Sequence, residues 1–168
     1  MKNIISTICS LYARLTTILG SLQPLSLLLF RLWVALAFWR AGVVKLADPM
    51  GTSYLFNYEY HVPILSPDLA ATMGTYVELI VPWLLGLGLF GRVSAIFLFV
   101  YNIIAVISYP ALWPHGLWVD FIGTEFTDHK VWGLMLLAII LFGPGKLSVD
   151  AAISKWLLPK FSKHTNLQ

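Results

Sequence analysis

Apolar residues dominate four long stretches of this chain and predict helices that cross a membrane. A bilayer-spanning helix needs about 20 mainly apolar residues, each rising roughly 1.5 Å. The four stretches lie at about residues 25–46, 69–90, 93–112 and 130–142. The last is short unless it begins near Phe126, so we expect its outer end to be tilted or shielded by a loop.

Both ends of the chain carry an amphipathic pattern instead. In residues 1–23 apolar side chains recur at helical spacing, which predicts a helix lying in the plane of the lipid headgroups. Pro24 is expected to permit a turn into the bilayer, and glycine and proline at 143–145 to end the last span. We therefore divide the chain into an interfacial helix (1–23), a transmembrane domain (24–147) and a short amphipathic helix with a basic tail (148–168).

The expected fold class is an all-α membrane protein: a four-transmembrane-helix bundle with an N-terminal interfacial amphipathic helix. Composition agrees, because 58% of the 168 residues are hydrophobic and only 11% are charged. A soluble domain carries about a quarter charged residues. The single cysteine, Cys9, excludes an intramolecular disulfide within this chain.

The charged residues sort to two sides of the predicted bundle. The side that holds the N-terminus carries Lys2, Arg14, Arg92, Lys146, Lys155, Lys160 and Lys163, and the other side carries Asp48, Glu59, Asp68, Asp120, Glu125 and Asp128. By the positive-inside rule both termini are cytoplasmic, in a bacterial inner membrane, and the long loops face the periplasm. A net charge of only +3, spread along the chain, argues against nucleic-acid binding.

Several ionisable or polar residues fall inside the predicted spans: Arg31, Arg40 and Lys45 in the first, Glu78 in the second and Asn102 in the third. A charge at the bilayer centre costs roughly 2.5–3.5 kcal/mol, so these groups need partners. Glu78 is expected at mid-depth, at a level between Arg31 and Arg40. We expect it to pair with Arg31 or Lys45, which share one helix face, with Asn102 as a further hydrogen-bond partner. Arg40, on the opposite face, is expected to reach the outer interface.

These buried charges support two interpretations, a structural staple between helices or a polar pocket for a ligand head group or a proton relay. For the second, the candidate residues are Arg31, Lys45, Glu78, Asn102 and His129, and no catalytic residue is assigned. His61, His115 and His129 fall on the outer side, where nearby carboxylates could complete a metal site. No two of them share metal-ligand spacing, so solvated or helix-capping histidines are the expected state and no metal site is predicted.

Motifs along most of the chain resemble those of a known family. They are Arg31, Phe38, Gly42 and Lys45-Leu46, then Gly74 and Glu78-Leu79, the Gly88-Leu89-Phe90-Gly91-Arg92 turn, and Gly143-Pro144-Gly145 with Ser148 and Asp150. In order and spacing they resemble the DoxX family of small membrane proteins over residues 25–151. His129 stands in a region where this family commonly has a carboxylate.

The resemblance implies a four-helix membrane bundle connected with quinone-linked redox chemistry or oxidative stress. Some relatives are subunits of quinol oxidase or thiosulfate:quinone oxidoreductase systems, and others associate with superoxide dismutase and a sulfurtransferase. The stretches at 59–63 and 107–110 resemble a subgroup found beside genes for copper-binding modified peptides. A quinone, a protein partner in the membrane or periplasm, and a homo-oligomer are therefore the expected associations besides the lipid bilayer.

Three functional hypotheses follow. In the first, the chain is a membrane subunit of a redox or oxidative/metal-stress system, in which Arg31 or Lys45 hydrogen-bonds a quinone carbonyl and Glu78 exchanges the proton. In the second, the same charges form the pathway of a small-solute or ion transporter, which would need an oligomer. In the third, the chain anchors or assembles other proteins and has no chemistry of its own. We adopt the first and do not expect a stand-alone enzyme.

Overall fold

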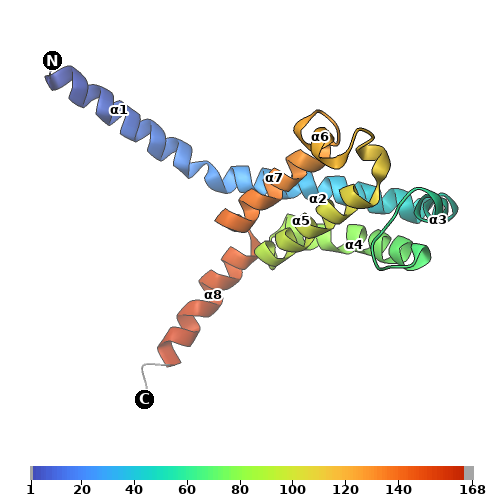
Figure 1. The fold of residues 1–168 in the computed structure, drawn as a ribbon. Helices are drawn as coiled ribbons and strands as arrows, with labels where there is room; N and C mark the ends of the chain where they lie inside the picture. Colours follow the sequence, from blue (N-terminus) through green and yellow to red (C-terminus); the bar gives the residue numbers. More distant parts are fainter. Residues whose placement is uncertain (1, 165–168) are drawn as a thin grey trace.

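Every regular element in the described part of the chain is a helix (Figure 1). The computed structural model describes the backbone of residues 2–164 and the side chains of residues 4–156. The helices are α1 (Lys2–Ser21), α2 (Gln23–Ala47), α3 (Pro49–Tyr58), α4 (Pro67–Leu87), α5 (Gly91–Ser108), the 3-10 helix η1 (Pro110–Leu112), α6 (Leu117–Ile122), α7 (Thr127–Phe142) and α8 (Val149–His164). The predicted all-α class is confirmed.

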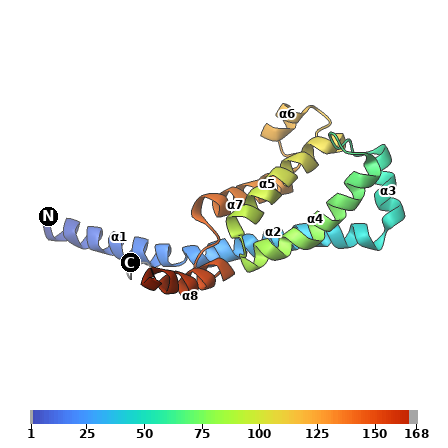
Figure 2. The same ribbon diagram turned by 90° about the horizontal axis from the view of Figure 1, so that it is seen from below.

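Helices α2, α4, α5 and α7 pack into one bundle, and α2 and α4 form its most extensive pair (Figure 2). The buried core contains Leu27, Val34, Phe38, Leu85, Ala95, Leu98, Leu136 and Ile139. Large apolar side chains such as Leu29, Ile80 and Val100 remain exposed on the outside of the bundle. An exposed apolar surface of this kind is stable only against lipid, so the chain is a multi-pass membrane protein.

Three stretches of the described residues are long and apolar enough to cross a membrane: Ile4–Ala47, Pro67–Leu87 and Gly91–Ser108. The fourth predicted span corresponds to α7, which packs against α2 and α5 and begins at Thr127, close to Phe126. Its 16 residues would rise about 24 Å, less than the roughly 30 Å of a bilayer core. Helix α7 thus begins near Phe126, as the longer alternative for this stretch required, and is still shorter than a bilayer core is thick.

Two helix ends differ from the predicted bounds for identifiable reasons. Helix α4 ends at Leu87, three residues early, because Gly88 takes a left-handed conformation (φ 68°) that closes the helix. Helix α5 ends at Ser108 instead of continuing to 112, since Tyr109 precedes a proline and is held out of the helical region (φ −119°, ψ 86°). The predicted connection at 47–68 is itself partly helical and contains α3.

Helix α1 continues almost directly into α2 and projects from the bundle, as both views show (Figures 1 and 2). The turn expected at Pro24 was wrong: Leu22 keeps right-handed helical backbone, and Pro24 lies in the first turn of α2, where its missing N–H is no loss. All side chains described in α1 are exposed. Helix α8 leaves the bundle at the same end as α1, opposite α3 and α6.

Candidate functional site

The carboxylate of Glu78 is held by two other helices of the bundle. Lys45 Nζ, from α2, lies 2.5 Å from Glu78 Oε2, and the Tyr101 hydroxyl, from α5, donates to Oε1 at 2.8 Å. The side chains of Lys45 and Glu78 are only 16% and 7% exposed. Both carboxylate oxygens thus have a strong partner, which is how a buried charge becomes tolerable. Of the two ion pairs that the sequence allowed, Glu78–Lys45 is the one formed.

The register of α2 against α4 explains this choice. A Cβ added at Gly42 would stand 2.9 Å from the Cβ of Glu78, so the two helices touch at this glycine. Lys45 follows Gly42 by almost one helical turn and reaches the carboxylate from there. The expected level of Glu78, between Arg31 and Arg40, was therefore wrong, because the Cβ and backbone of Glu78 lie opposite Gly42.

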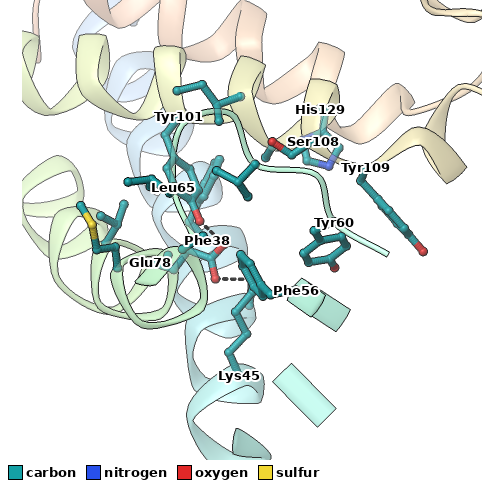
Figure 3. A pocket seen from close by; sticks show the side chains of 18 of the residues that line it. Phe38, Lys45, Phe56, Tyr60, Leu65, Glu78, Tyr101, Ser108, Tyr109 and His129 are labelled. Carbon is teal, nitrogen blue, oxygen red and sulfur yellow. Dashed lines mark hydrogen bonds and ion pairs between the residues drawn. The ribbon is translucent and has the colours of Figure 1, made fainter. Parts of the chain in front are cut away.

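A cavity of about 360 Å³ adjoins this ion pair. Its lining comes from all four bundle helices, together with α3 and the segment that follows α3. Aromatic side chains form much of the wall: Phe38 contacts Tyr101 and Trp132, with ring centroids 6.0 and 5.5 Å apart. Figure 3 shows Glu78 and Tyr101 on one side of this cavity, and Ser108 and His129 on another. The site is an apolar, aromatic chamber with polar groups at separate places on its wall.

Asn102 and His129 form a second polar pair, between α5 and α7. The Asn102 Nδ2 donates to the backbone oxygen of His129 at 2.9 Å, which leaves Asn102 Oδ1 to face His129 Nδ1 at 2.8 Å. Because an amide oxygen only accepts, His129 Nδ1 carries a proton and donates it. Asn102 thus pairs with His129 and not with Glu78, contrary to expectation. His129 also lines the cavity.

One rim of the cavity carries tyrosines and a buried serine. Tyr60 packs on Tyr109 with ring centroids 4.8 Å apart, and the Tyr109 hydroxyl donates to Glu59 at 3.3 Å. Burial, reinforced by the neighbouring Tyr109, raises the pKa of the Tyr60 phenol above its ordinary value, so it remains a neutral hydroxyl. Ser108 is 3% exposed, and its hydroxyl has no hydrogen-bond partner among the described residues.

Arg31 is fully buried but belongs to a different part of the bundle. Its guanidinium donates to the backbone oxygens of Gly86 and Leu147, so the alternative Glu78–Arg31 pair was wrong. A Cβ at Gly88 would meet the Arg31 Nη1 at 2.0 Å, which shows how tightly the α4–α5 turn closes over the guanidinium. Arg31 does not line the cavity at Glu78.

Asp150 fastens this same end of the bundle. Its two carboxylate oxygens accept from the backbone N–H groups of Phe90 (2.9 Å) and Gly91 (2.7 Å), at the start of α5. A carboxylate at a helix N-terminus satisfies free N–H groups and opposes the positive end of the helix dipole. The motifs around Gly88–Arg92 and Gly143–Asp150 thus contact each other and, together with Arg31, stabilise this end of the bundle.

The two other histidines with described side chains have separate partners. His115 Nδ1 lies 3.1 Å from Asp120 Oδ1, and His61 Nδ1 lies 3.1 Å from the backbone oxygen of Glu59. Within the described part of the chain, no three His, Cys, Asp or Glu side chains are grouped closely enough to hold a metal ion. Arg40 is exposed, in line with its predicted place on the opposite face of the helix.

Sequence reasoning overlooked two residues of the cavity wall, Tyr101 and Ser108. Both lie on α5 seven residues apart, a spacing that puts them on one helix face. That spacing is a usable signal, whereas the amide of Asn102, which was predicted to join Glu78, points to α7.

Fold and site together define a small helical-bundle membrane protein with a polar group buried beside an apolar chamber. The family comparison agrees: the model of the DoxX family matches residues 26–111, slightly more than half of the chain. The chain belongs to the DoxX family. The match covers α2 to α5 and so includes Lys45, Glu78, Tyr101 and Ser108, while α7 and α8 lie beyond it. No curated protein and no solved structure matches the chain.

Proposed function

We propose that this protein is an inner-membrane subunit of a redox or oxidative/metal-stress system, and that it binds a quinone in the cavity beside Glu78. One observation carries the proposal: a buried ammonium–carboxylate pair and a phenol hydroxyl adjoin an apolar, aromatic chamber within the bundle. A purely structural ion pair has no need of an adjacent chamber.

The residues fit such a ligand in size and in chemistry. A volume of about 360 Å³ lies in the range of small-molecule sites, which are mostly apolar with a few placed polar groups. Phe38 and Trp132 offer faces for a flat ring. Lys45 has N–H donors left for a carbonyl oxygen besides the one that bonds Glu78, and the buried Ser108 hydroxyl is a donor still without a partner.

Quinone chemistry takes up two electrons, supplied in this proposal by a partner redox protein, together with two protons, and yields a quinol. Glu78 would exchange one of these protons at its Oε1, along the hydrogen bond with the Tyr101 hydroxyl, and the second would come from water. When Glu78 is deprotonated, the ammonium group of Lys45 stabilises the negative charge of its carboxylate.

The orientation and the division of the chain belong to the same proposal. The excess of basic residues at the end of α1 and α8 supports cytoplasmic termini. The amphipathic pattern of α1 supports an interfacial segment (1–23) beside the transmembrane domain (24–147), which requires the chain to bend where α1 meets α2, with α8 in the cytoplasmic segment (148–168). Helix α7 would complete the fourth crossing, and the outer segments α3 and α6 would face a protein partner.

The test measures binding of short-chain ubiquinone and menaquinone to the purified protein in lipid nanodiscs. Quenching of tryptophan fluorescence reports the binding. The double variant Lys45→Met/Glu78→Gln removes both charges, so neither is left buried alone, and it should bind at least tenfold more weakly. Arg40→Gln, an exposed change in the same helix as Lys45, is the matched control and should bind normally. If the unchanged protein binds neither quinone, the proposal is wrong, and solute flux into liposomes without a redox partner would favour transport.

A further inference from the structure

The Ser108 hydroxyl is a second, unassigned polar group of the cavity. Its residue is 3% exposed and lines the chamber, yet its Oγ has no hydrogen-bond partner among the described residues. A buried hydroxyl that lacks a partner destabilises the fold, because it has lost its hydrogen bonds with water. Serines near a helix end usually bond a backbone oxygen of the preceding turn, as Ser94 of α5 does with Phe90 and Gly91.

Ser108 stands apart from the Glu78 centre, at a definite spacing. Tyr101 and Ser108 are seven residues apart on α5, which places their backbones about 10 Å apart along the helix axis on one face. Figure 3 shows them at different places on the cavity wall, with Tyr101 beside Glu78. The rest of the lining includes the aromatic side chains of Phe38, Phe56 and Trp132.

We infer that the cavity takes a flat, apolar ligand with a hydrogen-bond acceptor at each end, one held at Lys45 and the other by the Ser108 hydroxyl. The inference rests on the proposed function and adds a second binding group to it, since a para-quinone has two carbonyl oxygens on opposite edges of its ring. Two C=O bonds of about 1.2 Å across a six-membered ring separate these oxygens by roughly 5 Å. With a hydrogen bond of about 2.8 Å at each end, the two donor atoms can lie up to roughly 11 Å apart, so one ring can reach donors at separate places on the wall.

The experiment compares two probes that differ by one acceptor, in protein reconstituted in nanodiscs. The probes are a 1,4-naphthoquinone with a short alkyl tail and the corresponding 1-tetralone, which keeps one carbonyl. Ser108→Ala should weaken binding of the naphthoquinone by five- to tenfold and leave tetralone binding unchanged, because the single carbonyl of the tetralone is held at Lys45. The matched control is Ser94→Ala, which removes a buried hydroxyl of the same helix that is bonded elsewhere.

Stability of the ligand-free protein separates this role from a structural one. A structural serine would lower the unfolding temperature when replaced, whereas Ser108→Ala removes an unpartnered hydroxyl and should leave that temperature unchanged or raised. If the naphthoquinone binds equally well to the unchanged protein and to Ser108→Ala, the second anchor is refuted while quinone binding itself stands. Equal affinity of the unchanged protein for both probes would refute it too. If neither probe binds, the proposed function fails together with this inference.

Discussion

Gly42 of α2 lies directly against Glu78 of α4, so that a Cβ on the glycine would stand 2.9 Å from the Cβ of the glutamate. This contact determines the depth at which Glu78 sits beside α2. It also leaves Lys45, three residues further along, as the cation within reach of the carboxylate. A residue without a side chain thus determines which charges meet.

Replacing Gly42 by valine should separate α2 from α4 at this level. The added side chain has no space against Glu78 and the backbone of Leu79, which a Cβ would already approach to 3.0 Å. We expect a loss of roughly 1–3 kcal/mol in unfolding free energy, the usual range for overpacking. Stepwise denaturation in detergent micelles measures this loss.

Gly20→Ala is the control for this change. A Cβ at Gly20 meets nothing within 4 Å, and Gly20 lies inside α1, where alanine is the better helix former. The unfolding free energy of the Gly20→Ala protein should therefore be unchanged or slightly raised. A Gly42→Val protein as stable as this control would show that α2 and α4 do not pack as described.

Removing one member of the Lys45–Glu78 pair should be worse than removing both. Lys45→Met leaves a buried carboxylate with the Tyr101 hydroxyl as its remaining partner, which we expect to cost about 3–5 kcal/mol. In Lys45→Met/Glu78→Leu no charge remains, and most of this stability should return. A double-mutant cycle on unfolding in detergent measures the coupling, and a double variant less stable than both single variants would contradict a direct pair.

Asp150 should hold the start of α5 through its carboxylate. Asp150→Ala leaves the N–H groups of Phe90 and Gly91 without their acceptor, and we expect a loss of about 1–2 kcal/mol, as for a lost helix cap. Hydrogen exchange should quicken at these two amides first. Asp128→Ala, an exposed acid in the first turn of α7, is the comparison and should change stability by less than about 0.5 kcal/mol. Equal losses of stability from the two changes would show that the Asp150 carboxylate does not stabilise the start of α5.

Alkaline pH should reveal the burial of Tyr60. Its pKa is raised in the folded protein by loss of hydration and by the neighbouring Tyr109. The unfolded chain therefore releases this proton first, near a pH of about 10. The contribution to stability is fully present below that pH and is lost as pH rises through the folded pKa. The measurement is a titration of tyrosinate absorbance in the Tyr60→Phe protein and in the unchanged protein. The titration curve of Tyr60→Phe should lack one phenol that ionises late, at high pH. If the missing phenol ionises early instead, the pKa of Tyr60 is not raised.

The orientation in the membrane can be tested with the native cysteine removed. In a Cys9→Ser background, Thr124→Cys places a thiol in the loop before α7, and Lys146→Cys places one between α7 and α8, both at exposed positions. With cytoplasmic termini, a membrane-impermeant maleimide added to intact cells should label the Thr124→Cys protein alone. The Lys146→Cys protein should react only after lysis. The reverse pattern would overturn the orientation.

The sequence by itself determined the class of this protein and the location of its helices. Length and apolar character of a segment act locally, so the stretches at 25–46, 69–90 and 93–112 could be assigned as helices without knowing their neighbours. The cost of burying a charge is local too, which is why the need of Glu78 for a cation was predictable. The pair with Lys45 was one of two that the helix faces allowed.

Only the tertiary structure decided which partners meet. Arg31 bonds the backbone of Leu147, which is 116 residues away, and Asn102 meets His129 instead of Glu78. The cavity with Tyr101 and Ser108 on its wall exists because four helices adopt one register and one set of rotations. These depend on close contacts such as Gly42 against Glu78, between residues that local periodicity cannot connect.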